Sequence, residues 1–293
     1  MLKERMGEGS SPGASNRPFL MIFTDLDGTL LDQNTYGWEE AGPALDLCKR
    51  LNVPVILASS KTRAEMDLLR RMLSMASPFI TENGGGVFFP KEAFNEPLPG
   101  ASLDEGLWKW SLGVPYAYLV KGLQEIRDKL GWDIKGFSDM STEEISRLTG
   151  LDQEASRLAA LREYDEPFII LDKQVPDKDA LFKIVSEIGF TITPGGRFYH
   201  LQGNNDKGRA MEKVVDWYRQ SYRDVITIAL GDSPNDFPML ERADYPVLVR
   251  SQQEFPTLIK RIPRLRVTSE MGPKGWNSAI LDILGTEQET EDV

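Results

Sequence analysis

The strongest constraint on the fold is a repeated order of apolar runs of strand length, each ending in a polar cluster. PFLMIFTD, VPVILASS and PFITENGGG come early, and DVITIALGDSPND comes much later in the chain. Segments with helical spacing, such as WEEAGPALDLCKRLN and KTRAEMDLLRRMLSM, separate the early runs. This alternation is typical of a parallel sheet with helices on both faces. We therefore predict an α/β protein with a doubly wound, parallel-sheet (Rossmann-like) core.

The alternation stops after residue 90 and resumes near residue 202. The intervening chain contains EPFIILD, the helical pattern KDALFKIVSEIG and a hairpin pattern, FTITPGGRFYH. We interpret it as an α+β domain inserted into the core. A Gly/Ser/Pro-rich start and an acidic end predict disorder at the two ends. The expected order is a disordered lead-in (1–17), core (18–90), inserted domain (91–201), core (202–284) and a disordered tail (285–293).

Composition excludes several classes of function. The net charge is −11, from 34 basic and 45 acidic residues, which argues against binding nucleic acid or an anionic membrane. A small anion held by a local basic cluster remains compatible with it. The single cysteine, Cys48, rules out a disulfide framework and favours a cytoplasmic protein, with Cys48 in the core. No segment approaches the roughly 20 apolar residues that a membrane span needs.

Four polar clusters follow the predicted core strands: DLDGT, SSKTR, ENGGG and GDSPND. Ligands of open parallel sheets bind at the carboxyl ends of the strands, so the clusters predict one site. Each cluster alone has a plainer interpretation. An acid at a strand end is often a helix cap or a turn former, and Asn-Gly is a common hairpin signal. The four together, in this order, favour a functional site.

The residue types in these clusters indicate phosphoryl chemistry. Several carboxylates at one sheet edge repel one another and call for a cation. With one cysteine and one histidine in the chain, an oxygen-rich site suits Mg²⁺ better than a softer metal. A carboxylate can also attack phosphorus. Phosphoryl transfer needs a metal, a lysine, hydroxyls and backbone N–H groups, all of which the clusters offer.

The clusters resemble the motifs of a known superfamily. DLDGT, a strand ending in Ser59, Lys207 in NNDKG, and GDSPND are similar to the four motifs of haloacid dehalogenase-like phosphatases, with the inserted domain in the position of a cap. From residue 20 to about 282, the chain also resembles the mannosyl-3-phosphoglycerate phosphatase branch. The matching segments are ILASSKTRAEM, ITENGGGVF, GFSDMSTEEISRLTGL, REYDEPFIIL, GGRFYHL and GPKGWNSAI.

This resemblance implies a Mg²⁺-dependent phosphatase that works through an aspartyl-phosphate. Its product would be a glycosylglycerate, a compatible solute, so the implied pathway is mannosylglycerate biosynthesis. Asp25 would be the nucleophile, and Asp27 the general acid and then the base. Asp236 would act through the metal, through water or through the lysine. The implied catalytic residues are Asp25, Asp27, Ser59 and Lys207, and the implied metal ligands are Asp25, Asp27 (by its backbone carbonyl), Asp232 and Asp236.

Substrate recognition is predicted from charge and position. The carboxylate of a phosphoglycerate should meet a cation, and Lys61, Arg63, Arg197 and His200 are candidates. Arg197 and His200 are an odd number of residues apart, so on a regular strand they cannot share a face. Ser60 is an alternative to Ser59 as the phosphate contact. The full predicted set is Gly28, Ser60, Lys61, Arg63, Glu82, Asn83, Gly84, Gly85, Arg197, His200, Ser233 and Asn235.

Three other functions remain open from the sequence. A related phosphatase could act on another sugar phosphate, including the glucosyl analogue. A phosphomannomutase-like phosphotransferase would share the core motifs and need a bisphosphate activator. A binding protein without catalysis would have no need of Asp27 beside Asp25. We expect the partner to be a small anionic sugar-phosphate substrate and the protein to be a monomer or a homodimer.

Overall fold

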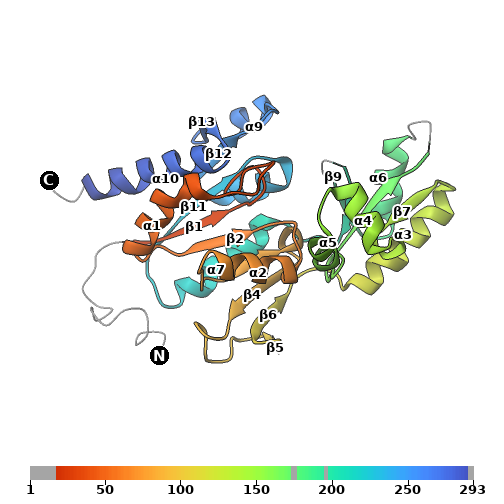
Figure 1. Cartoon of the computed structure of the whole chain (residues 1–293), viewed down its shortest axis with the longest axis horizontal. Coiled ribbons are helices and arrows are strands. Elements are labelled where there is room, and N and C mark those ends of the chain that lie inside the picture. The colour runs from red at the N-terminus through yellow and green to blue at the C-terminus, as the bar shows by residue number, and fades with distance from the viewer. Residues whose placement is uncertain (1–17, 173–176, 195–196, 290–293) are drawn as a thin grey trace. The chain divides into compact units, whose positions relative to one another are not determined.

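The computed structural model describes residues 18–172, 177–194 and 197–289 (Figure 1). The chain divides into two compact units: unit 1 holds Met1–Ile56 and Met211–Val293, and unit 2 holds Leu57–Ala210. The predicted lead-in lies outside the described residues. No helix in the described part of the chain has both the length and the apolar character needed to cross a membrane.

Unit 1 is built on parallel strands in the order β13-β12-β11-β1. β1 and β11 are in register from Phe19 opposite Val225 to Thr24 opposite Leu230. α10 continues to Glu289, within the predicted tail. The elements are β1 (Phe19–Thr24), η2 (Glu39–Ala41), α1 (Gly42–Arg50), β11 (Val225–Gly231), η5 (Pro234–Asp236), α8 (Phe237–Arg242), β12 (Tyr245–Arg250), α9 (Pro256–Arg261), β13 (Arg266–Met271) and α10 (Gly272–Glu289).

The core of unit 1 is made by the apolar strands and the helices packed on them. Phe23 on β1, Ile228 on β11 and Trp276 on α10 are completely buried. Cys48 is buried in α1, as predicted, and burial raises the pKa of its thiol to about 12. The thiol therefore stays protonated and acts as a small apolar group.

Unit 2 contains the strand order β2-β3-β4-β6-β5. β2 and β3 are parallel, whereas the later pairs are antiparallel. β4 returns antiparallel to β3 directly after the third apolar run of the sequence. β5 and β6, although beyond the predicted core boundary at residue 90, belong to this larger sheet. The elements are β2 (Val55–Ala58, which begins in unit 1), α2 (Arg63–Met72), β3 (Phe79–Thr81), η3 (Glu82–Gly84), β4 (Gly86–Pro90), β5 (Ser102–Asp104) and β6 (Leu107–Ser111).

A smaller antiparallel sheet, in the order β7-β8-β10-β9, forms the rest of unit 2. β9 and β10 pair as the predicted hairpin, although its Gly195-Gly196 turn lies outside the described residues. Ser141 and Glu144 form a capping box at the start of α4. The elements are α3 (Tyr116–Leu130), β7 (Ile134–Gly136), η4 (Phe137–Asp139), α4 (Thr142–Thr149), α5 (Gln153–Ala159), β8 (Asp165–Ile170), α6 (Lys178–Glu187), β9 (Thr191–Pro194), β10 (Tyr199–Gln202) and α7 (Lys207–Arg219, which ends in unit 1).

The predicted fold class is confirmed: an α/β core with a large, mainly parallel sheet and a separate antiparallel sheet with its own helices. α3, the longest helix described in the inserted segment, was not predicted from the sequence. α3 packs with α6 against the smaller sheet, where Leu119, Leu123, Phe168 and Leu181 share one buried cluster. The smaller sheet thus has a hydrophobic core of its own.

Candidate active site

The end of β1 is held by buried contacts. The Asp25 N–H donates to Leu230 O over 2.9 Å. The Thr24 hydroxyl donates to Asp25 O at 2.7 Å and accepts from the Trp276 indole N–H at 3.0 Å. Asp25 is only 6% exposed. The position of its carboxylate is therefore set by the sheet and by α10.

Gly28 allows the loop after β1 to pass close to the loop after β11. Its φ is +80°, a conformation that favours glycine. A Cβ there would lie 2.7 Å from Gln33 Oε1 and 2.8 Å from Asp232 Oδ2. The neighbouring Thr29 hydroxyl donates to Asp232 Oδ1 at 3.3 Å. The chain thus turns sharply at Gly28, while the contact of Gly28 with a substrate stays a prediction.

The loop after β11 is organised by the carboxylate of Asp236. Asp236 Oδ2 accepts the N–H groups of Asp232 and Ser233, both at 3.0 Å. The Ser233 hydroxyl lies 3.2 Å from Asp236 Oδ2 and 2.5 Å from Asn235 Oδ1. A Cβ on Gly231 would lie 2.4 Å from Asp236 Cβ, so glycine is needed there too. Ser233 and Asn235 hold the loop, and a substrate contact for either stays a prediction.

Three carboxylates of unit 1 meet at this edge of the sheet. One oxygen each from Asp25, Asp232 and Asp236 lies within 4.8 Å of the others, and we call these three residues the acidic group. Like charges this close oppose one another's ionisation unless a cation offsets them. An all-oxygen donor set of this kind fits Mg²⁺. Asp27 does not belong to the acidic group. The family resemblance implied that Asp27 would bind the metal through its backbone carbonyl.

In unit 2, the turn after β2 carries the two candidate serines. Ser59 is 1% exposed, and its N–H donates to Ile80 O at 3.0 Å. Its hydroxyl oxygen accepts the Lys61 N–H at 3.2 Å. Ser60 is half-buried, and its carbonyl accepts from the Arg162 guanidinium at 3.2 Å. The turn is thus ordered from both sides, and phosphate binding by either hydroxyl stays a prediction.

The ENGGG loop joins β3 to β4 through three successive residues with positive φ. The values are 47° at Glu82, 53° at Asn83 and 91° at Gly84. Non-glycine residues in this region cost about 1–3 kcal/mol each and persist where surrounding contacts hold them, often at functional sites. Here the Asn83 N–H donates to Ser59 O at 3.0 Å. The hairpin and the functional interpretations of this loop are therefore compatible.

Lys207 begins α7 beside the same loop. It is completely buried, and a buried ammonium is retained only where oxygen atoms meet it. A Cβ on Gly84 would lie 3.1 Å from Lys207 N. The Asn205 amide donates to the carbonyls of Glu82 and Asn83 at 3.4 and 3.3 Å. Unit 2 therefore brings together the ENGGG loop, Ser59 and the start of α7.

The Glu82 carboxylate is a buried anchor for the segment before β8. It accepts the N–H of Glu163 at 3.0 Å and that of Tyr164 at 2.7 Å. Burial raises the pKa of Glu82 to about 7, although Arg162 acts in the opposite direction. Gly85 is needed beside it, because a Cβ there would lie 2.3 Å from Tyr164 Cβ. Glu82 and Gly85 thus serve this packing, whatever their predicted role toward a substrate.

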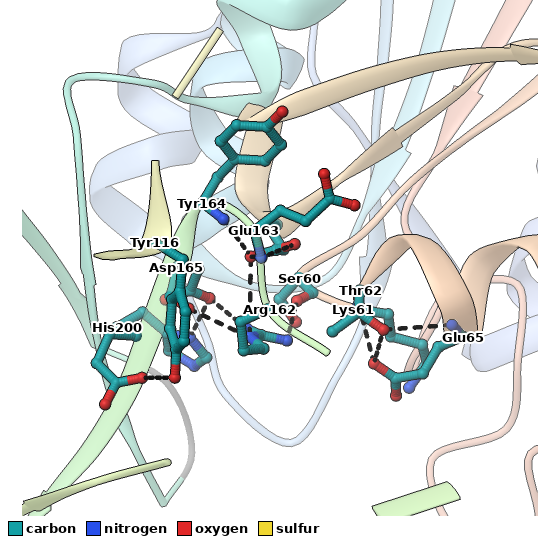
Figure 2. A network of polar contacts seen from close by, with 12 residues as sticks. Ser60, Lys61, Thr62, Glu65, Tyr116, Arg162, Glu163, Tyr164, Asp165 and His200 are labelled. Carbon is teal, nitrogen blue, oxygen red and sulfur yellow. Dashed lines mark hydrogen bonds and ion pairs between the residues drawn. The ribbon is translucent and has the colours of Figure 1, made fainter. Parts of the chain in front are cut away.

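Arg162 connects Glu82 to Asp165 on β8 and, through Asp165, to His200 on β10; Figure 2 shows Arg162, Asp165 and His200 in this network. The Arg162 guanidinium lies 2.5 Å from Asp165 Oδ2 and 3.9 Å from Glu82 Oε2. Asp165 Oδ2 also lies 2.7 Å from His200 Nδ1. Burial alone would raise the pKa of Asp165, but His200 and Arg162 hold it below its usual value. We call Glu82, Arg162, Asp165 and His200 the Arg162 network.

Two predicted substrate cations have partners within the chain. Arg63 pairs with Glu105 at 2.8 Å and with Glu163 at 3.2 Å. Arg197 is exposed and donates to the carbonyl of Leu148. Arg197 lies before β10 and His200 lies on it, so the argument from strand alternation does not apply to this pair. A role for either arginine toward a substrate carboxylate stays a prediction.

Comparison with known proteins identifies the class. A family profile described as haloacid dehalogenase-like hydrolase matches residues 22–107 and 154–254. A glucosyl-3-phosphoglycerate/mannosyl-3-phosphoglycerate phosphatase of Methanococcoides burtonii is 42% identical over 90% of this chain and 97% of its own. A mannosyl-3-phosphoglycerate phosphatase of Pyrococcus furiosus is 35% identical over 78% of this chain and 90% of its own.

A solved structure supports the fold independently. A protein from Thermoplasma acidophilum matches with a TM-score of 0.63 at 19% identity, covering 90% of this chain and 97% of its own. The chain belongs to the haloacid dehalogenase-like hydrolases. It is an enzyme, a phosphoric monoester hydrolase, and its sequence is similar to mannosyl-3-phosphoglycerate phosphatases over most of its length.

Sequence reasoning gave no role to several buried polar residues. Arg162 and Asp165 lie in REYDEPFIIL, a segment noted only for its resemblance, and Gln202 and Asn205 follow GGRFYHL. Asp165, Gln202 and Asn205 are 0%, 4% and 6% exposed. The one available signal was a dense group of charges directly before an apolar strand, because charges are rarely buried without partners.

Proposed function

We propose that the protein is a Mg²⁺-dependent phosphatase that hydrolyses mannosyl-3-phosphoglycerate, or a close glycosyl phosphoglycerate, to the glycosylglycerate and phosphate. The observation that carries this proposal is the 42% identity, over 90% of the chain, to a phosphatase named for both the glucosyl and the mannosyl substrate. The acidic group supports it, because its donor set suits Mg²⁺.

The proposed reaction has two steps, with residue roles taken from the matching motifs. An oxygen of the Asp25 carboxylate attacks phosphorus, and the bond from phosphorus to the glycerate oxygen breaks. Asp27 gives its proton to that oxygen. Asp27 then takes a proton from water, whose oxygen attacks phosphorus, so that phosphate leaves and Asp25 is regenerated.

The remaining roles concern charge. Ser59 donates to a phosphate oxygen, and Lys207 offsets negative charge on phosphate and nucleophile. Asp25, Asp232 and Asp236 would hold Mg²⁺, which when bound neutralises charge on the phosphoryl oxygens. Asp236, whose Oδ2 already accepts two N–H groups of its own loop, keeps Asp232 in place.

The sugar is the open part of this proposal. The double name of the Methanococcoides burtonii relative favours activity on both glucosyl and mannosyl substrates. A mutase-like reaction would instead return the phosphate to a sugar and depend on a bisphosphate activator. The two functions separate in one assay, since a phosphatase releases inorganic phosphate without an activator.

The test is phosphate release, with Mg²⁺ and with a chelator, across a small panel. The panel holds mannosyl- and glucosyl-3-phosphoglycerate, free 3-phosphoglycerate and several hexose phosphates. We expect Mg²⁺-dependent release with a strong preference for a glycosyl phosphoglycerate. Broad weak activity, or preference for a hexose phosphate, would keep the phosphatase class and overturn the substrate.

A further inference from the structure

The smaller sheet has one apolar face and one polar face. Across β8 and β10, Phe168 pairs with Tyr199 and Glu166 pairs with Leu201. Phe168 and Leu201 lie in the buried cluster with α3 and α6. Side chains alternate along a strand, so the residues between them point to the opposite face. The register places Asp165, Pro167, Thr191, Thr193, His200 and Gln202 on that face, which we call the polar face.

On the polar face, one carboxylate oxygen of Asp165 has hydrogen-bond donors, and the other has none among the described residues. Its Oδ2 lies 2.5 Å from the Arg162 guanidinium and 2.7 Å from His200 Nδ1 (Figure 2). Its Oδ1 is buried and has no hydrogen-bond donor among the residues that the structure describes. An ionised carboxylate only accepts hydrogen bonds, and a buried acceptor without a donor costs about 1–3 kcal/mol.

Gln202 lies directly opposite Asp165 in the sheet. Its Nε2 donates to Asn205 O at 3.0 Å, which sets the orientation of the amide. Its Oε1 is buried and, within the described ranges, receives no donor. Directly paired residues on one face have Cβ atoms about 5 Å apart. Two acceptor oxygens without donors therefore come from adjacent positions.

Asn205 carries a similar oxygen but does not belong to this pair. Its Oδ1 also lacks a donor in the described part of the chain. It lies against the backbone, however, 3.1 Å from where a Cβ on Gly113 would be and 3.2 Å from one on Gly203. The Asn205 side chain therefore packs between the backbone at Gly113 and the backbone at Gly203, whereas Asp165 and Gln202 share the polar face.

The polar face is partly exposed to solvent at the next residue pair along β10 and β9. The His200 side chain, next to Asp165, is 17% exposed, and Thr193 opposite it is half-buried. On the other side, Arg162 ties Asp165 to the carbonyl of Ser60, in the turn that holds the predicted phosphate contacts. The two oxygens thus lie between an open rim and the Ser59–Ser60 turn of the same unit.

We propose that Asp165 Oδ1 and Gln202 Oε1 accept hydrogen bonds from hydroxyl groups of the substrate's sugar and so determine its selectivity. This inference rests on the proposed function. Neighbouring sugar hydroxyls supply the two donors that this pair lacks. A site built to bind a hydroxyl strongly rejects a substrate that lacks it, because its own polar atoms are then left unpaired.

The test uses Gln202→Met, which removes the amide oxygen at similar size, and Asp165→Asn. The measured quantity is the ratio of kcat/KM for the glycosyl phosphoglycerate to kcat/KM for free 3-phosphoglycerate, which lacks the sugar. We expect each variant to lower this ratio about 10- to 100-fold. Deoxy-sugar analogues sharpen the test: for the analogue that lacks the recognised hydroxyl, Gln202→Met should cost nearly nothing further.

Glu166→Gln is the matched control. Glu166 is the next residue after Asp165 and equally buried, but it points to the opposite face, where Tyr116 of α3 and Ser138 of η4 satisfy its two oxygens. The Glu166→Gln variant should change the melting temperature and keep the kcat/KM ratio within about 3-fold of the wild-type ratio, a difference near 0.6 kcal/mol.

The outcomes separate this inference from the proposed function. If the wild-type protein shows no activity on any glycosyl phosphoglycerate, the proposed function fails. If it is active but folded Gln202→Met keeps the wild-type ratio, a bound water satisfies these oxygens and this inference is overturned. Gln202→Met decides the matter even if Asp165→Asn does not fold, because within the described residues the Gln202 amide donates to Asn205 O and takes no part in the hydrogen bonds that join Asp165 to Arg162 and His200.

Discussion

The acidic group of unit 1 and the Arg162 network of unit 2 both hold buried carboxylates, but they are built on opposite principles. The acidic group gathers three like charges within 4.8 Å. In the Arg162 network opposite charges meet: the Arg162 guanidinium lies between the carboxylates of Asp165 and Glu82, at 2.5 and 3.9 Å, and His200 Nδ1 lies beside Asp165. The first arrangement suits an added cation, whereas the second is balanced by the chain itself.

The two regions therefore have different roles in the protein. A cluster of like charges suits an added cation, and Asp25 or Asp232 can be changed with little harm to folding, whereas Asp236 also holds the backbone of its own loop. A balanced buried network holds strained backbone and cap segments in place, and loss of one member leaves a buried charge unpaired. Changes in the acidic group should therefore affect turnover, and changes in the network should affect stability and its pH dependence.

The largest expected effect is that of Asp25→Asn. Loss of the nucleophile should lower phosphate release by about 10⁴-fold or more. The melting temperature should not fall, because one of three repelling charges is removed. Asp46→Asn, an exposed acid on α1 of the same unit, is the control and should change neither quantity. Retained turnover in Asp25→Asn would reject covalent catalysis and, with it, the contrast between the two regions.

The next effect concerns Asp27→Asn. On a glycosyl phosphoglycerate the rate should fall about 10²- to 10⁴-fold, because the leaving alcohol needs a proton. An aryl phosphate has a better leaving group that needs none. With it, the variant should release one equivalent of aryl alcohol rapidly and then turn over slowly, as seen by stopped-flow absorbance. Equal slowing of both phases would contradict the two roles of Asp27.

The network is tested by Glu82→Gln. Folding raises the pKa of Glu82 to about 7 from an ordinary value of 4.5. Its contribution to stability is therefore complete below about pH 4.5 and is lost as the pH rises through 7. Over that range the wild-type protein should lose up to about 3 kcal/mol that the variant does not lose. Urea unfolding at several pH values measures this difference, and parallel curves for the two proteins would contradict it.

The smallest effect is stabilisation by the metal. Mg²⁺ at 100 times its Kd should add about 2.7 kcal/mol to the free energy of unfolding. The gain should vanish in Asp232→Asn and persist in Glu82→Gln, since only the first change touches the acidic group. A gain of the same size in Asp232→Asn would place the metal elsewhere.

The two regions also differ in how far the sequence predicts them. Asp25, Asp232 and Asp236 follow apolar strands, so the strand pattern and the sheet rule placed them at one edge before any coordinates. The Arg162 network depends on which antiparallel strands pair, and in which register. Periodicity does not specify that pairing, so Asp165 and Gln202 could not be matched from the sequence.

The same limit explains the errors of detail in the fold. β6 pairs antiparallel with β4, and β5 pairs antiparallel with β6. No helix separates these short strands from β4, so the strand–helix alternation that predicts the rest of the larger sheet does not include them. α3 begins after Pro115 without a side-chain cap, so the usual signal of a helix start is missing. The helix after Ser141 does carry that signal, a serine cap with Glu144 three residues later.

In the proposed mechanism Asp25 carries the phosphoryl group. The most direct test is to mix Asp27→Asn with an aryl phosphate and Mg²⁺, quench in acid, reduce with borohydride and sequence the peptides by mass spectrometry. Borohydride converts an aspartyl-phosphate to homoserine. We predict homoserine at position 25, dependent on substrate and Mg²⁺. A burst of aryl alcohol without homoserine there, or with homoserine at another aspartate, would contradict the account.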